Sequence, residues 1–309
     1  MSLLTLALAA AQVFAAPLDL PAKAQIEMTV VKTREDLREG EAGQPLTSRT
    51  VYAKTVEADG EGYRVTLKPT STELPKIGPA ENQAKVQSAL EGMLSRTYVY
   101  KADESLAPTA IEDWPAVVAD MTKVLQALAG NDPDVVKVMG GMTSMFGRMS
   151  PEQAADLMLK EDGMLSAAVN IELEVGKPFT YDDQVASPLG GGPIKANGVV
   201  VVERIDEPRG VGVVRWSQSI DPESATAVIT QLIQGLIAQM PAETPKPDFK
   251  AMMANAKLEN TSGCLYEINL KTGLPVRADC ESKTAITDPR SSRLSGRTER
   301  WVITQTLKN

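Results

Sequence analysis

The sequence predicts an α+β fold, with a curved antiparallel β-sheet and amphipathic helices packed on one of its faces. Alternation of apolar and polar residues, typical of strands, occurs in both halves of the chain. Two stretches with apolar residues at helical spacing interrupt it, and they need a sheet face to pack on. The resulting order of strands, helices, strands, helix and strands lacks the regular alternation of a parallel sheet. With 309 residues, 43% of them hydrophobic, the chain is long enough to bury a core.

The first strand region covers residues 24–106. Ile26, Met28 and Val30 alternate with polar neighbours, and the Asp-Gly-Glu-Gly sequence at 59–62 predicts a turn between two strands. A short helix is expected within this region, at residues 82–94.

Helices are expected over residues 113–163. Pro133, preceded by Asp132, is typical of a first helical position, and the Ser-Pro-Glu-Gln sequence that begins at Ser150 predicts a capping box. Further on we expect the following segments: strands over 175–220, a helix over 222–240, a proline-rich linker over 241–249 and strands over 257–307.

The N-terminal segment resembles an export signal. Residues 3–14 are apolar but too few to span a bilayer, and Val13-Phe14-Ala15 is a small-x-small cleavage pattern. We expect a signal peptide over 1–15, cleaved after Ala15, and a single α+β domain over 16–309 in the periplasm or outside the cell. The start carries no Lys or Arg, so either the true start lies upstream or the terminal amine supplies the charge. A buried apolar N-terminal helix is the alternative.

The two cysteines flank a predicted hairpin with a three-residue loop that ends at Gly273. If Leu270 faces Leu274, then Ile268 faces Val276 and Cys264 faces Cys280, although a bulge could shift this register by one residue. An oxidising compartment then favours a structural disulfide between Cys264 and Cys280. Two free or metal-binding thiols are the alternative.

The composition excludes several classes of function. Histidine is absent, which removes Ser-His-Asp and Cys-His catalysis and histidine metal ligands. The net charge is −8 and no basic run is present, which argues against a nucleic-acid partner and against charge-driven membrane binding. No later segment is apolar enough to be transmembrane. Carboxylate, lysine, tyrosine or serine–lysine chemistry remains possible. We expect no catalytic residue, no cofactor and no enzyme activity, and a carboxylate-dependent hydrolase ranks last.

A series of methionines lies at helical spacing: Met139, Met142, Met145 and Met149. Thioethers are suitable ligands for Cu(I), so a copper carrier is one interpretation. The same spacing is that of the apolar face of a helix, and this interpretation is preferred. A third possibility is an adaptable apolar wall around a lipid.

Two short motifs resemble exported bacterial proteins of unknown function with a lipoprotein-carrier-like architecture. They are Val-Gly-Lys-Pro-Phe at 175–179, at the start of a strand, and Lys-Thr-Gly-Leu-Pro at 271–275, in a hairpin turn. The resemblance implies a half-barrel-like sheet with helices in its concave side, able to hold an acyl chain or an apolar peptide. It carries over no catalytic residue.

From these features we predict a non-enzymatic protein that binds a lipid, an acyl chain or a hydrophobic segment between sheet and helices. The expected lining residues are Met121, Met142, Met145, Leu232, Leu236 and Met240. The alternative is a structural or interaction protein of the cell envelope, in which the apolar faces of the helices are completely buried in the core. The oligomeric state does not follow from the sequence.

Overall fold

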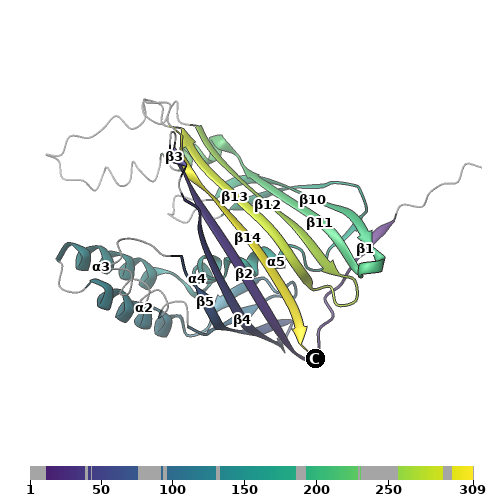
Figure 1. The fold of residues 1–309 in the computed structure, drawn as a ribbon, viewed down its shortest axis with the longest axis horizontal. Helices are drawn as coiled ribbons and strands as arrows, with labels where there is room; N and C mark the ends of the chain where they lie inside the picture. The colour runs from purple at the N-terminus through teal and green to yellow at the C-terminus, as the bar shows by residue number, and fades with distance from the viewer. Residues whose placement is uncertain are drawn as a thin grey trace, which may run out of the picture.

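The computed structural model describes residues 12–38, 41–42, 44–75, 92, 96–129, 133–185, 193–228, 230, 257–287 and 294–308. Over these ranges, twelve strands form one large curved antiparallel sheet and helices lie on one side of it (Figure 1), which confirms the predicted α+β class. Its strands are β2 (Lys23–Arg38), β3 (Glu41–Ala42), β4 (Leu46–Asp59), β5 (Gly62–Glu73), β6 (Tyr98–Ala102), β7 (Pro108–Ile111), β9 (Phe179–Val185), β10 (Ile194–Asp206), β11 (Val211–Ile220), β12 (Lys257–Asn269), β13 (Pro275–Thr287) and β14 (Leu294–Lys308).

The strand order places β2 and β14, the first and last strands of this sheet along the sequence, side by side at its centre. The order is β7-β6-β5-β4-β2-β14-β13-β12-β11-β10-β9, with β3 paired to β2. Most neighbours are joined by hairpins, whereas β2 and β14 come from opposite ends of the sequence. Among the described residues β7 and β9 do not pair with each other, so the sheet stays open. Two short strands, β1 (Val13–Ala15) and β8 (Glu172–Glu174), form a separate pair.

Two predicted turns are confirmed. Asp59 pairs with Gly62, and Gly60 between them adopts a φ of +64°, which glycine tolerates without strain. In the cysteine hairpin Gly273 has a φ of +65°, and Cys264 is joined to Cys280 by a disulfide. One detail of the predicted register is wrong, because a bulge beside the turn places Ile268 opposite Pro275 rather than Val276.

Four helices connect the two strand regions: α2 (Trp114–Ala129), α3 (Pro133–Arg148), α4 (Pro151–Met158) and α5 (Lys160–Ser166). The capping box at Ser150 is confirmed, since Ser150 and Gln153 each bond the other's backbone N–H. The indole of Trp114 donates to the Phe146 carbonyl at 3.2 Å, which joins the start of α2 to the end of α3. None of the described helices is long and apolar enough to cross a membrane.

The remaining expected helices fall partly beyond the described residues. Gly92 is helical, and the rest of the helix expected at 82–94 lies outside the description. Residues 222–228 are helical. The remainder of the helix expected over 222–240, apart from residue 230, and the linker expected over 241–249 lie outside it as well.

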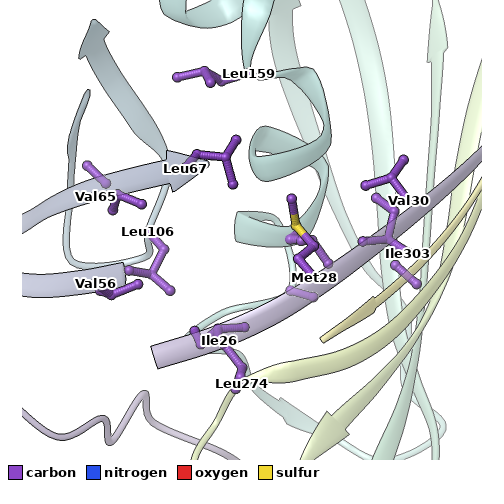
Figure 2. Close-up of a cluster of buried hydrophobic side chains, with 14 of the residues drawn as sticks. Ile26, Met28, Val30, Val56, Val65, Leu67, Leu106, Leu159, Leu274 and Ile303 are labelled. Atoms are coloured by element: carbon purple, nitrogen blue, oxygen red, sulfur yellow. The ribbon is translucent and has the colours of Figure 1, made fainter. Parts of the chain in front are cut away.

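The core lies between the sheet and α4–α5. Ile26, Met28 and Val30 of β2 point to the same side, and all are at most 6% exposed. Figure 2 shows these side chains gathered with Leu67 of β5 and with Leu159, the residue between α4 and α5. The other face of the sheet carries ion pairs such as Arg300–Glu281, in which both side chains are more than half exposed. One face is therefore covered by helices and the other is in water.

Candidate functional site

A hollow of about 420 Å³ lies between α4–α5 and strands β11–β13. Its size falls in the range of small-molecule sites, roughly 300–1,000 Å³. Most of the side chains around it are apolar or small, with a few polar ones among them. This is the type of space that the sequence predicts between sheet and helices.

Residues on the covered face of three neighbouring strands form the floor. Trp216 of β11 lies opposite Cys264 of β12, which lies opposite Cys280 of β13. Residues directly opposite one another share a face of the sheet, so the indole and the disulfide form one continuous row. Tyr266, two residues from Cys264, extends the floor, and its hydroxyl donates to the Met164 carbonyl at 2.7 Å. This hydrogen bond ties α5 to the floor of the hollow.

The opposite wall is made of small and apolar helical residues. Ala155 of α4 and Leu159 are nearly fully buried, and Met164 of α5 is half-buried. Gly163 also lines the hollow, and a β-carbon at this position would meet no atom within 4 Å. A larger side chain at position 163 would therefore have room beside α5.

A buried ion pair fixes α5 over the sheet. Lys54 of β4 donates a hydrogen bond to Asp162 of α5, and both side chains are at most 2% exposed. Burial and the negative charge of Asp162 raise the pKa of Tyr100 well above its usual value. Since an unpaired charge in this position is very unfavourable, the pair holds α5 in one place on the strands.

A cation stands at the edge of the hollow. The Lys160 ammonium lies 4.4 Å from the centre of the Trp301 ring and 3.9 Å from a carboxylate oxygen of Glu299. Burial lowers the pKa of Lys160, against the opposing effect of Glu299. Burial alone would raise the pKa of Glu299, but its hydrogen bond with Lys32 and the charge of that lysine outweigh burial and lower it. Lys160 therefore adds a positive charge to a lining that also contains polar residues such as Asp156, Gln218 and Glu281.

A second depression, of about 490 Å³, lies across strands β11–β14. Its lining includes Arg215 and Arg300, which form exposed ion pairs with Glu203 and Glu281. This depression shares Trp216, the disulfide and Glu281 with the hollow, but Arg215 and Arg300 add charged pairs that remain hydrated, so it is less suited to an apolar molecule. The hollow beneath α4–α5 is the better candidate.

The described lining residues differ from those that the sequence indicates. Met121 is buried on α2, and Met145 is 48% exposed on α3; neither lines the hollow. The side chain of Met142 is not among those described, and Leu232, Leu236 and Met240 lie outside the described residues. Their role as lining residues stays a prediction.

The methionine series lies on one helix. Met139 and Met149 are half-buried on α3 and at its end, whereas Met145 is exposed. Met149 and Phe146 pack against the core, as the preferred interpretation of the series expects. Copper binding by these residues stays a prediction. Among the described residues no group of three or more His, Cys, Asp or Glu could hold a metal ion.

The hollow is also lined by residues that the sequence does not indicate, namely Trp216, Tyr266, Met164 and Gly163. Alternation along β11 and β12 could have placed Trp216 and Tyr266 on the same face as Val214 and Cys264. The sequence did not show which helix covers these strands.

No protein-family profile matches the chain, and no curated protein is similar to it. A solved structure titled "Lipid-protein interactions in lipovitellin" is similar over 94% of this chain and 25% of that one, with 13% sequence identity and a TM-score of 0.41. The chain thus spans about a quarter of that protein's length. A likeness of this size carries no argument about function.

Proposed function

We propose that this protein is a non-enzymatic binding protein that holds an apolar ligand, such as a lipid acyl chain, in the hollow beneath α4–α5. The observation that carries the proposal is a 420 Å³ space between sheet and helices, lined by Trp216, the disulfide, Leu159 and Met164. Each Å² of apolar surface removed from water contributes about 25 cal/mol.

We also propose that the protein works outside the cytoplasm as one α+β domain, after removal of a leader over residues 1–15. The apolar run at 3–14 and the disulfide between Cys264 and Cys280 support this, because disulfides persist in oxidising compartments. A soluble carrier of apolar molecules has an evident use in such a compartment.

Gly163→Phe tests the binding site. Gly163 lines the hollow and a β-carbon there would meet no atom within 4 Å, so a phenyl group has room beside α5; glycine is also a poor helix former, so we expect the variant to fold. A dansyl-labelled fatty acid, displaced by palmitate, measures binding. We expect the variant to bind at least about 10-fold more weakly than the wild type, a difference of about 1.4 kcal/mol.

The matched control is Gly141→Phe. Gly141 is an exposed helical glycine on α3 that also has no atom within 4 Å of a β-carbon, but it does not line the hollow. The control should bind as the wild type does. Equal binding by both variants, or a wild type that neither binds the probe nor carries lipid in native mass spectrometry, would count against the proposal and in favour of a structural role.

A further inference from the structure

The short strand β1 occupies a groove beside β8. It pairs antiparallel with β8, with Phe14 opposite Leu173, and the Val175 N–H donates to the Gln12 carbonyl at 2.8 Å. The segment after β8 is held by the large sheet, where the Gly176 N–H donates to the Val202 carbonyl at 2.8 Å. Strand β1 is therefore an outer strand, added to an edge that the rest of the chain holds in place.

Phe14 is the anchor of this strand. Its side chain is 1% exposed and belongs to the main core, whereas Val13 and Ala15 on either side are exposed. The ring lies against Gly212 of β11, where any β-carbon would overlap it. Strand β1 thus buries one aromatic side chain in a pocket over Gly212, which we call the aromatic cup.

The chain just after Ala15 is attached by hydrogen bonds that do not involve β1. The Leu18 N–H donates to Asn170 Oδ1 at 2.8 Å, and the Asn170 amide donates to the Glu104 carbonyl at 3.1 Å. The Asp19 N–H donates to the Thr272 carbonyl at 2.9 Å. All these bonds lie beyond Ala15. A chain that begins at Ala16 therefore keeps its N-terminal segment attached, and the Gly176–Val202 hydrogen bond still holds the chain that follows β8.

We propose that the mature protein accepts an extended peptide segment of a partner in place of β1, with an aromatic side chain seated over Gly212. The inference rests on the proposed export, since cleavage after Ala15 removes β1 and leaves the edge of β8 and the aromatic cup open. Addition of a strand to a free edge supplies backbone hydrogen bonds, and a pocket for one side chain supplies selectivity. The hollow beneath α4–α5 takes no part in it.

The charges beside the groove indicate the chemistry of the segment. Glu174 lies opposite Val13, and Glu172 lies opposite Ala15. Opposite charges directly across a strand pair are stabilising, so we expect Lys or Arg on either side of the aromatic residue. Glu174 also pairs with Lys177 at 3.1 Å, so the position opposite Glu172 should be the more selective.

Peptide binding to a chain that begins at Ala16 tests the proposal. The probe is an amidated, fluorescein-labelled peptide of sequence Gln-Val-Phe-Ala-Ala, which is that of residues 12–16. We expect saturable binding by anisotropy and a higher Tm, and a loss of about 10-fold or more when serine replaces the phenylalanine. A peptide with Lys on both sides of the phenylalanine should bind more tightly than one with Glu.

Gly212→Ala tests the contact with the aromatic side chain in two chains, one that lacks β1 and one that contains it. In the chain that begins at Ala16 the new methyl group fills the cup, so the protein should fold and lose peptide binding. In a chain that begins at Gln12 it overlaps Phe14, so the Tm should fall. Gly198→Ala is the matched control, because its β-carbon overlaps Tyr181 on β9 whether or not β1 is present, and it should lower the Tm of both chains alike.

Two results would overturn the proposal. One is a folded chain from Ala16 that does not bind the peptide; if that chain does not fold alone, failure of the peptide to restore a cooperative melt has the same meaning. The other is an intact mass of the exported protein that retains residues 12–15, since β1 then fills the groove itself. Loss or retention of fatty-acid binding in Gly163→Phe affects neither result.

Discussion

At the residue scale, the buried Lys54–Asp162 pair matters most for the position of α5. Lys54→Met leaves Asp162 charged and unpaired in a dry environment, so we expect a loss of about 3–5 kcal/mol in the free energy of unfolding. The double variant Lys54→Met/Asp162→Leu should recover most of this loss, because it removes both buried charges. Denaturant titration of the two single variants and the double variant measures the coupling. Losses that simply add would show that the two side chains do not interact.

A second residue-scale prediction concerns stability at high pH. Burial, followed by the negative charge of Glu161, raises the pKa of Tyr52 to about 12, above the ordinary value of about 10. Between these values the folded state keeps a proton that the unfolded chain loses, so stability is full below about pH 10 and falls as pH rises toward 12. Tyr52→Phe should make this fall less steep in denaturant titrations at increasing pH. An unchanged slope would show that Tyr52 ionises normally.

At the scale of elements, the cysteine hairpin formed by β12 and β13 has two roles: it is part of the large sheet, and its disulfide forms part of the floor of the hollow. The disulfide closes a loop with a sequence separation of 16 residues, and loops of this size contribute about 3 kcal/mol. Cys264→Ala/Cys280→Ala should lower the free energy of unfolding by about 2–4 kcal/mol, measured by denaturant titration. Reduced wild type is the control and should resemble the variant. A fully reduced protein with unchanged stability would show that the sheet alone fixes the hairpin.

Local patterns predicted most of these elements, and tertiary arrangement decided the rest. Period-two alternation placed Ile26, Met28 and Val30 on the covered face, and the capping box at Ser150 set the start of α4. Lys54 falls in the same alternation as its neighbours on β4, but only α5 supplies the Asp162 that makes its burial tolerable. The pairing of β2 with β14, by contrast, has no local signal. The lining of the hollow depends on which helix lies over which strands, so it could not be predicted.

At the scale of the whole molecule, the pairing of β2 with β14 joins the first and last strand regions at the centre of the sheet. An interior strand can open only if its bonds on both sides break, so the two halves should unfold together. Hydrogen exchange with mass spectrometry at increasing denaturant tests this: β4 and β12, on opposite sides of the central pair, should lose protection at the same denaturant concentration. The edge strands β7 and β9, bonded on one side only, should exchange earlier. Separate transitions for β4 and β12 would mean two folding units. The single-domain proposal would then fail, because β2 and β14 would be an interface between two domains rather than the centre of one.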